Sequence, residues 1–266
     1  MINILKADIY KILHGKGIYI TFVVLLGFIL LVLLTQHFFL NQLIIDDPAL
    51  TIALDGLVQE INGTNVILSH LMGMLTELHL FLLAIVVITS TPIFTHGTAK
   101  NDISRGVSRT KLYMSKLILC SILCVIMYLF FVATGVLIAT ILNGFGTAVN
   151  GHWSNVFKTL GIQLLMLFAM TSVGVFFTFT TKKTAAVNVL HLIFFFIPSI
   201  IFQVILLLNE NLQWLSNLAI SNLISQMSNI NTAETNQIII ALVVALSHII
   251  IFTIGGISLF KKAEVK

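Results

Sequence analysis

Charged residues are scarce in this sequence, and their scarcity excludes a soluble globular protein. Only 9% of the 266 residues are Asp, Glu, Lys or Arg, whereas 58% are hydrophobic. A soluble chain carries about 25% charged and roughly 45–50% apolar residues, and a single core of this length could not bury so much apolar surface. Lipid is therefore the expected solvent for most of the chain.

Cysteine is also rare, and the motifs of several enzyme classes are missing. The two cysteines, Cys120 and Cys124, lie one helical turn apart in an apolar run, which predicts small packing residues and neither a disulfide framework nor a metal site. The sequence has no G-x-x-x-x-G-K-[ST], no G-x-S-x-G and no H-E-x-x-H. We therefore expect no catalytic residue, no metal and no cofactor bound by this chain itself.

Long uncharged runs are what the sequence has in abundance. A helix needs about 20 apolar residues to cross the hydrocarbon core of a bilayer. The first run is too long for the apolar region of a signal peptide and is followed by no small-x-small cleavage site, so we expect it to be retained. The predicted fold is an all-α integral membrane protein forming a single transmembrane domain over 1–266, with spans at 18–40, 78–95, 117–142, 159–181, 184–207 and 237–260.

The basic residues indicate the orientation of these spans. Of the 14 Lys and Arg residues, only Lys158 falls on the other side from the rest. The positive-inside rule makes the basic side cytoplasmic, so both termini are predicted to be inside, in a bacterial plasma membrane. The high pI then reflects topology and does not indicate nucleic-acid binding. The residues assigned to the inside are Lys6, Lys11, Lys16, Lys100, Arg105, Arg109, Lys111, Lys116, Lys182, Lys183, Lys261, Lys262 and Lys266.

Three segments outside the spans are expected to lie at the membrane surfaces. Residues 1–17 predict an interfacial helix, although a plain basic flank to the first span is the alternative. Residues 41–77 and 208–236 are predicted to be extracellular and to contain short helices, the second of them half-buried before the last span. The apolar residues that indicate these helices are Leu5, Ile9, Ile12 and Leu13, then Leu54, Leu57, Val58 and Ile61, then Leu212, Leu215, Leu218, Ile220, Leu223, Ile224 and Met227.

Two histidines and a proline inside the spans are candidate pathway residues. His191 and His248 indicate a polar lining of a pathway or a proton-sensitive contact, and the alternative is neutral imidazoles bonded across helices. Pro198 is expected to kink or locally open the fifth span. Glu77 and His79, at the predicted outer end of the second span, are expected to contact polar headgroups; His70 and Glu77 could share a helix side, so weak zinc binding is the alternative.

The charge that the chain does have gathers in one short stretch, HGTAKNDISRGVSRTKLYMSK, which spans residues 96–116. Its glycines predict a chain that leaves the second span, forms a short helix at about 98–105 capped by Thr98, and turns again before Ser108 caps the third span. Such bracketing suits a docking element beneath the membrane. The candidate docking residues are Gly97, Thr98, Lys100, Asp102, Ser104, Arg105, Gly106, Ser108 and Arg109.

These residues resemble a known family. Gly97-Thr98-x-Lys100, then Ser104-x-Gly106-x-Ser108-Arg109, then Lys116 in the next helix is similar to the cytoplasmic coupling segment of ABC-2 type transporter permeases. With the six-span plan and the basic N-terminus, the resemblance covers nearly the whole chain. The small size is most similar to permeases of lantibiotic and bacteriocin immunity and antimicrobial-peptide export. One departure is that Ile93, Phe94, Thr95 and His96 fill the region where many members carry a Glu, so no gating role of that acid carries over.

The resemblance implies a permease subunit that exports an amphipathic peptide. It implies two cytoplasmic ABC ATPase subunits, which would bind ATP and Mg, and a second permease, the same or a related chain. It further implies that the second and fifth spans line the interface between permeases. The alternatives are an ABC-2 permease for a drug, a lipid-linked or an ionic substrate and, more remotely, a membrane protein without transport or an intramembrane enzyme.

Overall fold

The regular elements of this chain are helices wherever the structure describes it. The computed structural model describes residues 2–46, 62–64, 66–67, 74–148, 152–208, 213–227 and 235–263. Within those ranges, six helical segments are long and apolar enough to cross a membrane. They are α2 (Lys16–Asp46), α4 continued by α5 (Leu75–Ser90 and Pro92–Thr95), α7 (Arg109–Asn143), α8 (His152–Thr181), α9 (Thr184–Leu208) and α12 (Thr235–Lys262). Each predicted span lies inside one of these segments.

Two helices begin about two turns earlier than the uncharged runs. α7 starts at Arg109, directly after the predicted Ser108 cap, whereas its uncharged run starts at 117, and α8 starts at His152, whereas its uncharged run starts at 159. The helices extend beyond the uncharged runs because lysines near a helix end do not stop the helix. Lys111 and Lys158 keep their side chains exposed, and Lys116 is buried but has a carboxylate partner.

The α8 helix lies at the centre of the bundle, where it contacts α4, α7, α9 and α12. Small and polar side chains line these contacts. The Cys120 thiol of α7 lies 2.8 Å from the Thr89 hydroxyl and 3.0 Å from that of Ser90, both on α4, and the Thr171 hydroxyl of α8 donates to Cys124. Both thiols are free and buried, as predicted, and they also join the polar contacts that hold helices together in lipid.

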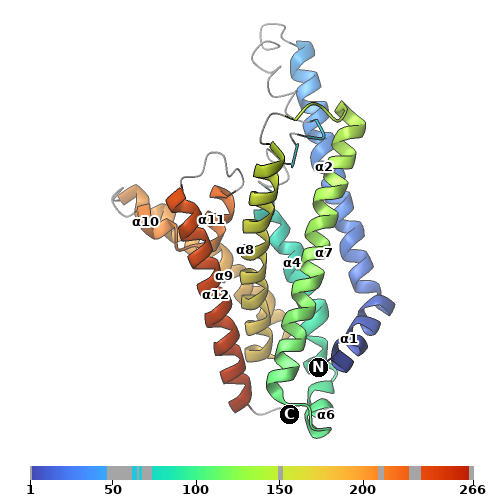
Figure 1. Cartoon of the computed structure of the whole chain (residues 1–266), viewed down its shortest axis with the longest axis vertical. Helices are drawn as coiled ribbons and strands as arrows, with labels where there is room; N and C mark the ends of the chain where they lie inside the picture. The colour runs from blue at the N-terminus through green and yellow to red at the C-terminus, as the bar shows by residue number, and fades with distance from the viewer. Residues whose placement is uncertain are drawn as a thin grey trace.

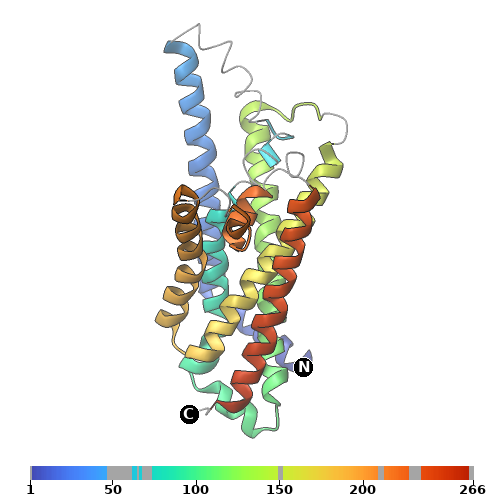
Figure 2. The same ribbon diagram turned by 90° about the vertical axis from the view of Figure 1, so that its left-hand side faces the viewer.

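The two ends of the bundle differ in charge. Figures 1 and 2 show both termini and α6 (Thr98–Ser104) at one end, together with the turn between α8 and α9. The described residues place there every Lys and Arg of the chain up to Lys262 except Lys158. We call this the basic end. The predicted clustering of positive charge is thus a feature of the fold, because helices far apart in sequence bring it together.

The N-terminal helix α1 (Ile2–His14) packs against α7 and then meets α2 at Gly15. Its predicted apolar stripe divides between two faces. Leu5 and Ile12 face the bundle and share that face with the buried Asp8, whereas Ile9 and Leu13 are about half exposed. The inner face is therefore not purely apolar.

At the opposite end, two short helices lie before α12: α10 (Gln213–Ser216) and α11 (Ile220–Gln226). α11 buries Ile220, Leu223 and Ile224 and contacts α4, α9 and α12, as the apolar spacing predicted. Gly63 and Thr64 donate backbone hydrogen bonds to the carbonyls of Gly144 and Phe145. The predicted helix through Leu54, Leu57, Val58 and Ile61 lies outside the described residues, as does Leu212.

Candidate functional site

The candidate site is the helix α6 and the two turns that bracket it at the basic end. Gly97 precedes α6 with a φ of 64°, and Gly106 follows it with a φ of 87°. Both values lie in the left-handed region, where a side chain is strained, so glycine allows the chain to reverse at each end of a seven-residue helix. The described geometry thus contains the short bracketed helix that the sequence predicts.

The caps of α6 differ in one respect from the prediction. Gly97, and not Thr98, is the N-cap residue, and no side chain caps the helix. The Thr98 hydroxyl instead donates back to the Ile93 carbonyl over 3.4 Å, which ties α6 to the end of α5. The prediction was wrong because a left-handed residue already turns the chain, and Thr98 then starts the helix proper. Ser108 does cap α7, since its hydroxyl accepts from the Lys111 N–H.

The two faces of α6 have different partners. Ala99 is buried and Ile103 packs against the core of the bundle. The opposite face is exposed and carries Lys100, Asn101, Ser104 and Arg105, with Asp102 at its margin. α6 is therefore anchored through two small apolar contacts and presents a polar, mainly cationic surface away from the membrane spans.

Arg109 does not lie on that exposed surface. Its Nη1 atom donates to three carbonyl oxygens at the C-terminal end of α12, those of Phe260 at 3.0 Å, Lys261 at 2.6 Å and Ala263 at 2.7 Å. The guanidinium carbon also lies 5.9 Å from the centre of the Phe260 ring. A cation at the carbonyl end of a helix is favourable, so Arg109 connects the bracketed segment to the last span.

Asp8 and Lys116 form a buried ion pair that the sequence reasoning missed. The Lys116 Nζ atom lies 2.8 Å from an Asp8 carboxylate oxygen, and the two residues are 3% and 7% exposed. The pair joins α1 to α7 two turns above Arg109. The signal for Asp8 was present, because it falls on the same helical stripe as Leu5 and Ile12.

The candidate pathway histidines lie in two separate places. His191 of α9 is fully buried, and its ring centre is 6.4 Å from that of His79 of α4, which stacks on Phe195. The expected headgroup contact of His79 is wrong, because the side chain is only 1% exposed. Neither ring nitrogen of His191 has a hydrogen-bond partner among the described residues.

His248 and Pro198 lie elsewhere, on a small cavity of about 150 Å³ between α9, α11 and α12. The His248 Nδ1 atom lies 2.8 Å from the Val244 carbonyl oxygen of its own helix. α9 continues as one helix through Pro198. The structure does not bring His191 and His248 into one site. Within the described ranges, no three His, Cys, Asp or Glu side chains are grouped as metal ligands would be.

One family matches this chain over residues 29–265, and its description is "Protein of unknown function (DUF2705)". Because the match covers far more than half of the sequence, the chain belongs to that family. Curated proteins gave no match.

Proposed function

We propose that this member of the DUF2705 family is the membrane-spanning subunit of an ATP-driven exporter of the ABC-2 type. The observation that carries the proposal is α6: a short helix fixed by two left-handed glycines, with its apolar residues against the bundle and Lys100, Ser104 and Arg105 exposed. The resemblance of the same residues to a coupling segment adds to it.

In this proposal, α6 inserts into a groove of a cytoplasmic ABC ATPase. Two such ATPases bind ATP and Mg, and this chain supplies the membrane path. Movement at α6 would pass to the spans by two routes, through the hydroxyl of Thr98 to α5 and through the guanidinium of Arg109 to the end of α12. Both routes consist of hydrogen bonds to backbone carbonyls.

A second permease, the same or a related chain, would pack over α4. Two apolar hollows flank that helix on its outer side. One is lined by Leu80, Ala84 and Asn188 at the α9 side, and the other by Val24 and Phe28 at the α2 side. The resemblance assigns the dimer interface to the second span, which is α4 continued by α5, and to the fifth span, which is α9.

The proposed substrate is an amphipathic peptide such as a lantibiotic, bacteriocin or other antimicrobial peptide. The near absence of charge in the spans disfavours a strongly charged cargo, and the phenylalanines of α8, α9 and α12 suit a bulky apolar one.

The coupling role of α6 predicts a specific loss of ATPase binding. Arg105→Glu reverses the charge of the exposed face, and Gly106→Val forces a branched side chain into the left-handed region. Each should weaken ATPase docking, by about 1.5–3 kcal/mol where a charged hydrogen bond is lost, and peptide resistance should fall with it. The measurement is recovery of the ATPase with tagged permease from native membranes, alongside a resistance assay.

Two matched controls separate docking from general strain. Gly144 at the opposite end also has a positive φ, of 78°, and like Gly106 has open space around it, so Gly144→Val forces a branched side chain onto a positive-φ backbone away from α6. Lys6→Glu reverses an exposed charge at the basic end without touching α6. Both controls should retain ATPase binding. Full ATPase binding and full resistance in the Arg105 and Gly106 variants would refute the coupling role.

We also propose that the basic end faces the cytoplasm of a bacterial cell. A cysteine introduced as Ser104→Cys should then resist an impermeant thiol reagent on intact cells and react after permeabilisation, whereas Thr147→Cys at the opposite end should react at once. The background is low because both native thiols are buried. Labelling of Ser104→Cys from outside would contradict this orientation and place the basic end outside the cell.

A further inference from the structure

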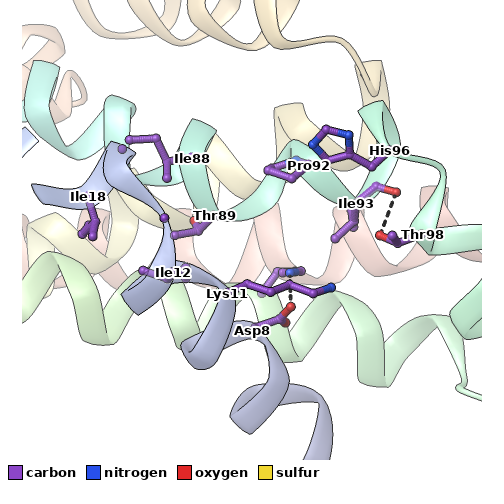
Figure 3. A pocket seen from close by; sticks show the side chains of 13 residues that line it. Asp8, Lys11, Ile12, Ile18, Ile88, Thr89, Pro92, Ile93, His96 and Thr98 are labelled. Carbon is purple, nitrogen blue, oxygen red and sulfur yellow. Dashed lines mark hydrogen bonds and ion pairs between the residues drawn. The ribbon is translucent and has the colours of Figure 1, made fainter. Parts of the chain in front are cut away.

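A cavity at the basic end contains charged groups that the coupling role does not use. It has a volume of about 400 Å³ and lies between α1, the corner at Gly15 and Gly17, the lower part of α4 with α5, and α7. Figure 3 shows the side chains of Asp8, Lys11, Thr89 and His96 around it. Pockets of this volume hold small ligands or headgroups.

The ion pair on the wall of this cavity is incompletely satisfied. One Asp8 oxygen meets Lys116 at 2.8 Å, while its other oxygen, Oδ2, is buried and has no hydrogen-bond partner among the described residues. An ammonium group carries three N–H donors, so Lys116 retains donors beyond the one directed at Asp8. A buried ion pair is favourable only when the remaining donors and acceptors are also satisfied, so the cavity requires an occupant that is polar on this side.

The charges of the lining define the occupant further. Lys11 and Lys116 oppose the single carboxylate of Asp8, so the formal charges of these three residues sum to one positive charge. An occupant that neutralises it carries one negative charge, and it also needs a hydrogen-bond donor for Asp8 Oδ2. The remaining wall is apolar and includes Ile12, Ile18, Ile88 and Ile93. The cavity therefore combines two cationic groups that can bind an anion, a carboxylate oxygen that can accept a hydrogen bond, and an apolar wall.

We propose that this cavity binds the headgroup of an anionic, hydroxyl-bearing phospholipid, of which phosphatidylglycerol is the simplest. The phosphodiester would be held by Lys11 and Lys116, a glycerol hydroxyl would donate to Asp8 Oδ2, and the acyl chains would lie along the isoleucines. Phosphatidylethanolamine has a donor but no net charge, so it would leave the positive charge of the lining uncompensated. The inference requires neither export activity nor a particular orientation of the basic end.

Native mass spectrometry of the full chain tests this directly. The delipidated protein is titrated in detergent with phosphatidylglycerol, phosphatidylethanolamine or soluble glycerol 3-phosphate. Phosphatidylglycerol is expected to bind about tenfold more tightly than phosphatidylethanolamine, the gain expected from one charged hydrogen bond. Glycerol 3-phosphate, which lacks acyl chains, should not displace it.

Two lysines of α1 provide a matched pair of variants. Lys11 and Lys6 are both exposed, but only Lys11 lines the cavity. Lys11→Gln should weaken phosphatidylglycerol binding about tenfold, whereas Lys6→Gln should leave it within about twofold. Because neither residue is buried, both variants should fold.

Four results would overturn the proposal. Equal affinity for phosphatidylglycerol and phosphatidylethanolamine would show that the cavity does not select a lipid by the net charge of its headgroup. Equal weakening by Lys11→Gln and Lys6→Gln would show only general attraction of anionic lipid to α1. Displacement of the lipid by glycerol 3-phosphate would show a site for a soluble phosphate ester, and binding of neither lipid above background would show a cavity that holds water.

Discussion

Replacing Asp8 with alanine should lower the free energy of unfolding by about 3–5 kcal/mol, the cost typical of removing one partner from a buried ion pair. The loss is large because Lys116 is only 3% exposed and would retain a buried charge with no counter-ion. Reversible unfolding in mixed detergent micelles with increasing SDS would measure it.

The size of this loss should depend on which charges remain. Lys116→Ala should also destabilise, since Asp8 then stays buried alone. The double change Asp8→Leu with Lys116→Leu removes both charges and should cost far less than either single change. Asp102→Ala, at a half-exposed acid on α6, is the control and should stay within about 0.5 kcal/mol. Additive losses in the double variant would contradict a coupled pair.

The spans could be predicted from the sequence, but the ion pair between Asp8 and Lys116 could not. The spans could be predicted because about 20 uncharged residues in a row have few alternatives to crossing a membrane. Asp8 and Lys116 are 108 positions apart, and no local pattern relates them. Read alone, Lys116 looked like a basic residue marking the start of a span, although the helix begins two turns before it.

Some features of the candidate site could likewise be predicted from the sequence, and others could not. Gly97 and Gly106 could be predicted because a left-handed turn requires glycine locally, and the bracketed helix followed from them. The role of Arg109 could not, since its three acceptors lie at the end of α12, more than 150 positions away. His79 was misplaced for a related reason: its depth depends on how far α9 rises beside α4, and the stacking of His79 on Phe195 is a tertiary fact.

Two adjacent glycines of α12 lead to the other large effect. Gly256 is buried against Tyr113 of α7, and a Cβ atom added there would lie 2.6 Å from both Cε2 and Cζ of the tyrosine ring. That ring is fully buried, lies 4.8 Å from the ring of Phe179, and donates its hydroxyl to the Phe252 carbonyl over 3.1 Å. Moving the tyrosine ring aside would therefore disturb its packing on Phe179 and its hydrogen bond.

Gly256→Ala should consequently lower the free energy of unfolding by about 2–4 kcal/mol, because it adds overpacking to the loss of the Tyr113 hydrogen bond. Gly255→Ala is the matched control, since a Cβ there would meet Phe176 at an ordinary 3.6 Å, and alanine is the better helix former by about 0.5–1 kcal/mol. The neighbouring substitutions should thus act in opposite directions in the same SDS titration. The contact between α7 and α12 near the hydrogen bonds of Arg109 should also loosen in Gly256→Ala. Hydrogen exchange at the C-terminal turns of α12 should therefore rise in that variant alone. Equal stability of the two alanine variants would show that the tyrosine ring moves aside without cost.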